Sequence, residues 1–163
     1  MDSSSLTASP VPGPVGSTAR KRVDAIKHHV LVDSAAILVA AAVTAANVQD
    51  RSALPRLRRQ AKPVAPSNAH AWVHNGYTGS TVADAPAKTA VTIDVVSGPK
   101  PARGFIVAPR RWVIEHTNGR INHCRHLDRH YQDTLTAHQG FLILSQIALP
   151  LRRLDQSPLI DTL

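Results

Sequence analysis

The sequence lacks the residues that build disulfide-stapled or membrane-spanning proteins. It has one cysteine, Cys124, which excludes an internal disulfide and with it a stapled secreted scaffold. The most apolar stretch, Ala35–Ala46, is shorter than the ~20 residues that a spanning helix needs. Near the N-terminus, Asp2 and a Ser/Pro run stand where a signal peptide has basic residues and a long apolar region. We therefore expect a cytoplasmic protein with no membrane segment.

Aromatic residues are also scarce, at 4% of the chain, although apolar residues reach 43%. A packed interior must then be built from Ala, Val, Leu and Ile. The 163 residues suffice for one domain with a single core and exclude multidomain machinery. The apolar content also excludes collagen-like and wholly disordered chains.

Acidic residues are outnumbered, with 11 Asp and Glu against 19 Lys and Arg, which gives a formal net charge of +8. A strongly basic chain favours a polyanionic partner, of which nucleic acid is the first candidate. Membrane headgroups are the weaker alternative.

The residue pattern predicts a short series of strands. Residues 1–19 are rich in Ser, Pro and Gly and are expected to be a flexible segment that precedes a domain over residues 20–163. Strands are predicted at His28–Asp33, Ala71–Val73 and Val91–Val96. The segment Ile37–Val43 fits either a helix or a buried strand, because its alanines suit the first and its Ile, Leu and Val the second.

Helices are predicted between and after these strands, at Asp50–Lys62, at residues 80–90, at Arg111–Tyr131 and at Phe141–Leu154. Asp50 or Ser52 is the expected N-cap of the first. Pro150 should kink or shorten the last. Residues 97–103 read as a loop. The order of elements indicates an α/β fold, a mixed sheet flanked by helices, with one strand missing at the front.

The predicted helix over Arg111–Tyr131 is amphipathic. Its apolar stripe consists of Val113, Thr117, Ile121, Cys124, Leu127 and Tyr131, at steps of three and four. The other faces carry histidines and arginines, which we interpret as a solvated or phosphate-facing basic stripe. The spacing of His123, His126 and His130 also invites a zinc site, the less favoured alternative, because a tetrahedral site needs a fourth ligand.

Glu115 is the only glutamate of the chain and lies within the basic run RRWVIEHTNGR. Two interpretations are open. An acid near the start of a helix complements the helix dipole. A carboxylate surrounded by bases is alternatively a ligand or catalytic group.

Several ordered blocks resemble one family. The strings KHHVLVDS (27–34), VTAANVQDR (43–51), VHNGYTG (73–79) and RRWVIEHTNGR (110–120) follow the order seen in bacterial insertion-sequence transposases of the DDE class, with the insertion-sequence-five group the nearest in pattern. The RRWVIEHTNG block is the most specific of these strings, and the pair Gly76-Tyr77 is a second anchor. The resemblance covers nearly the whole chain and implies a ribonuclease-H-like fold.

The resemblance implies three acids that hold two Mg²⁺ ions for cleavage and transfer of DNA strands. Asp2 matches the first acid, because MDSSS resembles the family's first acidic segment, and Glu115 matches the third. The second acidic position is occupied by His74. Imidazole is a neutral nitrogen donor that does not suit Mg²⁺, so we expect a catalytic set of Asp2, His74 and Glu115 in which only Asp2 and Glu115 bind metal.

The resemblance also implies DNA as the partner, both at the element's ends and at the target. The expected phosphate contacts are Arg110, Arg111, Arg125 and Arg129. A second copy of the chain or an intact transposase is the expected protein partner. We interpret the chain as a truncated and degenerate C-terminal catalytic portion that acts in DNA transposition with impaired chemistry, in the nucleoid. The alternative is a catalytically inactive remnant that binds DNA or dimerises.

Overall fold

The computed structural model describes residues 1–9, 14–17, 23–67, 70–74, 77, 92–96 and 111–155. The elements in chain order are β1 (Asp2–Thr7), β2 (Gly16–Ser17), β3 (Asp24–Val32), β4 (Leu38–Ala45), a 3-10 turn η1 (Asp50–Ala53), α1 (Leu54–Val64), β5 (His70–His74), β6 (Thr92–Val96), α4 (Arg111–Asn122), α5 (Arg125–Asp128) and α6 (Leu135–Asp155). The described residues thus form both strands and helices, as expected of a mixed α/β chain.

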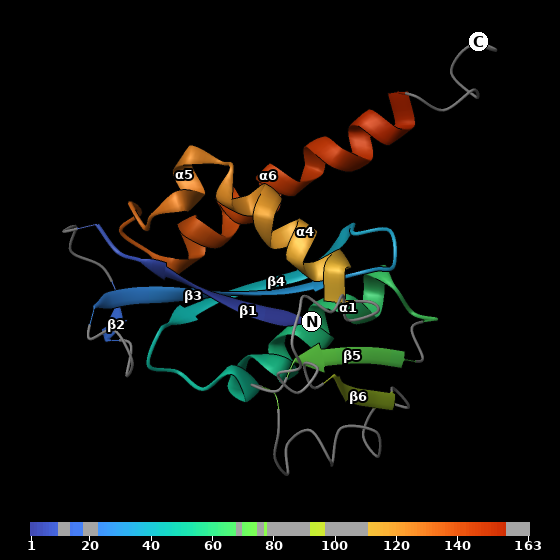
Figure 1. Ribbon diagram of the computed structural model, residues 1–163, viewed down its shortest axis with the longest axis horizontal. Helices are drawn as coiled ribbons and strands as arrows, with labels where there is room; N and C mark the ends of the chain where they lie inside the picture. The colour runs from blue at the N-terminus through green and yellow to red at the C-terminus, as the bar shows by residue number, and fades with distance from the viewer. Residues whose placement is uncertain are drawn as a thin grey trace, which may run out of the picture.

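β3 is the centre of the larger sheet. It pairs antiparallel with β1, β2 and β4, and the β1 register places Asp2 opposite Val30 and Thr7 opposite Ala25. β5 and β6 form a separate parallel pair. The two sheets adjoin at the start of the chain, where the Met1 amino group donates to the Trp72 carbonyl of β5 at 2.6 Å. Figure 1 shows this end of β1 beside β5 and below α4.

The two faces of the larger sheet are covered by different helices, because successive strand residues point to opposite sides. Val30 of β3 belongs to one core, which α4, α5 and α6 cover through Ile121, Leu127 and Leu142. Its neighbour Leu31 belongs to the other core, which α1 covers through residues such as Leu57. The result is a sheet between two helical layers (Figure 1). Small alanines of β4 line both cores, as the scarcity of aromatic residues predicted.

The start of the chain differs from the expectation of a flexible segment and a missing first strand. Residues 2–7 form β1, which is paired along its whole length with β3. The prediction failed because serine-rich composition indicates flexibility, whereas here Ser3 donates to Asp50 and Leu6 fills the core. The missing strand is therefore a wrong prediction, and the domain boundary at residue 19 stays a prediction.

Three other elements resolve or correct the sequence predictions. The ambiguous segment at 37–43 is a strand, β4. The predicted single helix at 111–131 is wrong, because Cys124 has an extended backbone and divides it into α4 and α5. α6 begins before the predicted Phe141 and continues through Pro150 to Asp155. The predicted helix at 80–90 and the loop at 97–103 lie outside the described residues. Among the helices that are described, none is both long enough and apolar enough to cross a membrane.

Candidate functional site

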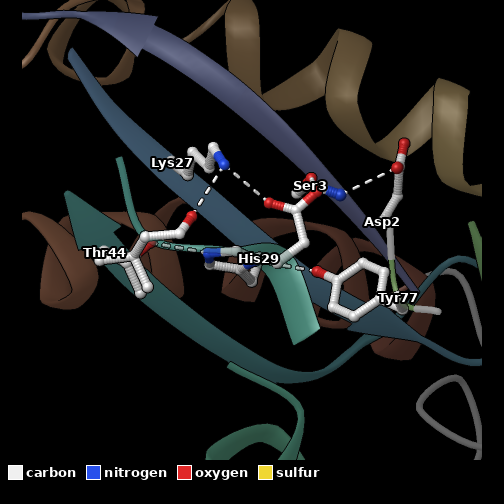
Figure 2. Close-up of polar contacts among 8 residues, drawn as sticks. Asp2, Ser3, Lys27, His29, Thr44 and Tyr77 are labelled. Carbon is white, nitrogen blue, oxygen red and sulfur yellow. Dashed lines mark hydrogen bonds and ion pairs between the residues drawn. The ribbon is translucent and has the colours of Figure 1, made fainter. Parts of the chain in front are cut away.

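Asp2 lies on β1 and faces the helical layer that contains α4. Its Oδ1 accepts a hydrogen bond from the Ser3 backbone N–H at 2.8 Å, and its Oδ2 accepts one from Asn118 Nδ2 at 3.3 Å. Figure 2 shows the carboxylate directed toward the helix and away from Tyr77. Asp2 is thus held firmly although residues 1–19 were expected to be flexible, because strand pairing fixes its backbone and two donors orient its side chain.

Glu115 lies on the part of α4 that approaches Asp2. Residues three apart on an α-helix share a face, so Glu115 is on the same side as Asn118, which donates to Asp2. The Glu115 side chain is exposed. α4 begins at Arg111, which places Glu115 beyond the first turn, where the helix dipole acts most strongly. This position weakens the interpretation of Glu115 as a helix-dipole acid.

Residue 74 is the last residue of β5, and this end of β5 lies beside the start of β1, which carries Asp2. Its backbone lies two residues beyond Trp72, whose carbonyl accepts the bond from Met1. Two strand residues span about 6.6 Å, so the strand ends that carry position 74 and Asp2 are neighbours. The topology thus brings β1, the end of β5 and one face of α4 to the same place, with Asp2, His74 and Glu115 as the residues that the resemblance singles out.

A second polar group lies on the other face of β1. Ser3 Oγ donates to Asp50 Oδ2 at 2.7 Å, and Lys27 Nζ donates to Asp50 Oδ1 at 2.9 Å. Lys27 also donates to the Val48 carbonyl. Asp50 therefore ties β1 and β3 to the start of η1, and the predicted N-cap role of Asp50 or Ser52 is wrong, since no side chain caps η1 or α1.

His29 and Tyr77 form a buried pair beside this group (Figure 2). The His29 Nδ1 atom lies 2.8 Å from the Tyr77 hydroxyl, and its Nε2 atom lies 2.8 Å from Thr44 Oγ1. Burial lowers the pKa of His29 to about 4 and raises the pKa of Tyr77 above its usual value, the second effect being reinforced by Asp50 and Asp2. Both groups are neutral at pH 7. Tyr77 packs with Val73 and Leu54, so it anchors the chain just after β5.

Replacing Tyr77 with Phe should lower the free energy of unfolding by about 1–3 kcal/mol, because a buried ring nitrogen of His29 loses its partner. Urea denaturation at pH 7.5 measures the effect. The matched control is Tyr131→Phe, since Tyr131 is 47% exposed and should change stability by less than about 0.5 kcal/mol. Equal effects at the two positions would contradict the anchoring role of Tyr77.

The donor set at the edge does not fit the two-Mg²⁺ site that the resemblance implies. Mg²⁺ takes oxygen ligands in octahedral geometry, whereas position 74 offers imidazole nitrogen. Within the described ranges, no group of three or more His, Cys, Asp or Glu side chains is placed to hold a metal ion. Asp94 is an acid that could in principle replace the missing one, but it lies on β6 and pairs with His70 at 2.8 Å. Two further oxygen donors of the sequence, Asn75 and Asp84, lie outside the described residues.

The structure describes the side chains of two of the four predicted phosphate-binding arginines. Arg125 on α5 and Arg129 just after it are exposed. Arg111 is the first residue of α4, and Arg110 lies outside the described residues. Arg125 and Arg129 therefore present cations on the side of the sheet that carries Asp2.

The predicted histidine stripe is only partly correct. His116, His123 and His126 are exposed, but His130 is 2% exposed. His130 lies in a buried cluster with His28 and His138, in which His28 Nε2 and His138 Nε2 are 2.6 Å apart and His130 Nδ1 and His138 Nδ1 are 3.2 Å apart. The break between α4 and α5 turns His130 inward, which separates it from the other two members of the predicted zinc spacing.

Some residues around the site were missed from the sequence. Asn118 is one of them, although its place one helical turn after Glu115 was the available signal. No sequence pattern predicted that Ser3, Lys27 and Asp50 contact one another, because their contacts join residues that are distant in sequence.

Comparison with known proteins identifies one family. A family model described as "Transposase DDE domain" matches residues 1–150. No curated protein and no solved structure gives a significant match.

Proposed function

The chain belongs to the transposase DDE-domain family, and on this premise we propose that it acts on the DNA ends of an insertion sequence of the insertion-sequence-five group. The proposed core is ribonuclease-H-like. One observation carries the proposal: the hydrogen bonds Met1 to Trp72 and Asn118 to Asp2 join β1, β5 and α4 at the edge where Asp2, position 74 and Glu115 belong.

The family reaction is metal-dependent cleavage and transfer of DNA strands, and in this chain it is impaired. Asp2 and Glu115 supply two carboxylates, but His74 supplies neither the charge nor the oxygen that Mg²⁺ requires. The Ser3 backbone N–H and the Asn118 side chain still orient the Asp2 carboxylate. The impairment therefore comes from the identity of one ligand and not from a disordered first strand.

DNA binding does not depend on that ligand. The chain has a net charge of +8, and Arg125 and Arg129 are exposed on the side of the sheet that carries Asp2, next to the C-terminal end of β1. With Arg110 and Arg111 they form the proposed contacts to phosphate, which give affinity without reading sequence. The second candidate function follows from the same residues: a catalytically silent DNA-binding protein that associates with an intact transposase on chromosomal DNA in the cytoplasm.

The purified chain should bind duplex DNA and, with Mg²⁺ present, should neither cut nor join the ends of its element. The logarithm of the binding constant should fall linearly with the logarithm of salt concentration, by about 0.9 per phosphate contact. Fluorescence anisotropy at several salt concentrations measures the slope, and a gel assay of labelled ends measures cleavage.

The double variant Arg125→Ala/Arg129→Ala should reduce that slope by up to about 2. Its matched control is Arg59→Ala, because Arg59 is exposed on α1, on the opposite face of the sheet. A binding constant independent of salt would contradict the DNA contacts, and robust strand transfer by the unmodified chain would contradict the impairment.

A further inference from the structure

α6 carries large apolar side chains on a face that the rest of the described chain leaves in water. Four aliphatic side chains lie along this face: Leu144 at 63% exposed, Ile147 at 42%, Leu151 at 58% and Leu154 at 61%. Figure 1 shows the C-terminal half of α6 extending outward from the helical layer. Four large aliphatic side chains along one helix face form a contiguous patch, and such patches mark interaction sites.

The spacing of these residues is regular. Together with Ala137 and Gly140, which are also exposed, they follow one another at alternating steps of three and four. We call this set, Ala137, Gly140, Leu144, Ile147, Leu151 and Leu154, the α6 seam. Alternation of three and four is the a/d pattern by which two helices pack against each other.

The opposite side of α6 is already used by the fold. His138 and Leu142 are fully buried and Gln146 is 7% exposed, all on the side that packs against the sheet. Arg153 continues this side by donating to the Ala35 carbonyl at 2.8 Å. α6 therefore uses one side to pack against the fold, while the apolar α6 seam lies on the opposite side, which the rest of the described chain does not cover.

We propose that the α6 seam is covered by the α6 seam of a second copy of this chain, with the two helices antiparallel. The charge distribution favours this occupant, because residues 139–151 contain no charged side chain although the chain as a whole carries +8. Two copies can therefore meet here without placing like charges in contact.

The sizes of the seam residues set the orientation. The small residues Ala137 and Gly140 are at one end of the seam and Leu151 and Leu154 at the other. An antiparallel pair centred between Leu144 and Ile147 places leucines of one copy against the small residues of the other. A Cβ atom at Gly140 would meet nothing within 4 Å, so the space for a partner's leucine is open. A parallel pair would place the small residues of one copy against the small residues of the other and leave voids.

The area that two α6 seams would bury against each other is enough for a weakly associating dimer. Covering the seam and its flanking Phe141 and Ile143 on both copies removes on the order of 1,000 Å² from water, which is below the ~1,200–2,000 Å² of stable interfaces and in the range of weak, transient ones. We therefore expect a dissociation constant in the micromolar range. The inference does not depend on the proposed DNA chemistry.

Sedimentation equilibrium of the full chain from 1 to 200 µM tests the proposal. The chain should dimerise, and Leu144→Glu/Leu151→Glu should be monomeric, with a dissociation constant raised at least about 100-fold, since each factor of ten needs only about 1.4 kcal/mol. The matched control is Val64→Glu, because Val64 is 65% exposed on α1 and outside the seam. Circular dichroism checks that all variants are folded.

Cysteine pairing tests the orientation in a Cys124→Ser background. Gly140→Cys/Leu151→Cys should give a covalent dimer on mild oxidation, whereas Leu151→Cys alone should not. A chain that stays monomeric at 200 µM, or equal dimerisation by the seam variant and the control, would overturn the proposal. Efficient cross-linking of Leu151→Cys to itself would overturn the antiparallel arrangement.

Discussion

Replacing His74 with Asp should give this chain Mg²⁺-dependent cleavage at its element's ends, where the unmodified chain gives none. The strand that carries Asp2 is present and paired, so no added segment is required. Aspartate at the end of β5 supplies the missing oxygen and negative charge beside Asp2 and Glu115. Since removal of one group that stabilises a transition-state charge costs about 10²–10³ in rate, we expect a gain of at least about 100-fold over background.

The measurement combines strand cleavage of labelled DNA with Mg²⁺ binding by calorimetry. His74→Asn is the matched control, because it offers an oxygen without a charge and should bind Mg²⁺ weakly. His74→Asp/Asp2→Asn should lose the gain. If His74→Asp neither binds Mg²⁺ nor cleaves while remaining folded, the assignment of position 74 to the site is wrong.

Acidification from pH 7.5 to pH 5 should remove about 4–6 kcal/mol of stability, most of what a small domain has. Burial lowers the pKa of His28 to about 3, with His138, His29 and His130 nearby adding to the effect. Burial also lowers the pKa of His138 and of His29 to about 4. All three side chains are at most 2% exposed, so solvent screens them little.

The direction follows from proton binding. In the unfolded chain these imidazoles titrate near 6.5, whereas in the folded chain they stay neutral down to about 4 or lower. The unfolded state therefore binds more protons between those values, and stability is full above about pH 6.5 and falls as the pH decreases. Each such imidazole lowers the free energy of unfolding by about 2 kcal/mol at pH 5.

Urea midpoints at pH 7.5 and pH 5 measure this loss. His28→Gln should reduce the difference between the two midpoints, because glutamine can bond to His138 but does not titrate. His123→Gln, at an exposed position, should leave the difference unchanged. An unmodified chain with the same midpoint at both values would rule out the burial of neutral histidines.

The sequence predicted the strands best where the apolar pattern was unambiguous. His28–Asp33 and Val91–Val96 correspond to β3 and β6 within a few residues. It failed at β1, where pairing with β3 overrides the weak strand tendency of four polar residues followed by Leu6. It also failed at the α4–α5 break, because the apolar stripe continues to Leu127 across a residue whose backbone is extended.

At the site, the motif residues could be named in advance but their supports could not. The resemblance pointed to Asp2, position 74 and Glu115, and it pointed to Tyr77 only as half of a Gly-Tyr anchor. The structure supplies the reason for that anchor, a buried hydroxyl bonded to His29. Contacts such as Ser3 with Asp50 link residues 47 positions apart, and no local pattern encodes them.

Successive side chains of β1 point to opposite faces of the sheet, and this alternation fixes the register of β1 against β3. Asp2 points to the α4 side, while Ser3 meets Asp50 on the other side. A slip of β1 by one residue against β3 would exchange the two faces. It would then bring the carboxylate of Asp2 toward that of Asp50 and push Leu6 out of the core. Charge repulsion and lost apolar packing thus both disfavour the misaligned strand, so a serine-rich segment can hold a single register.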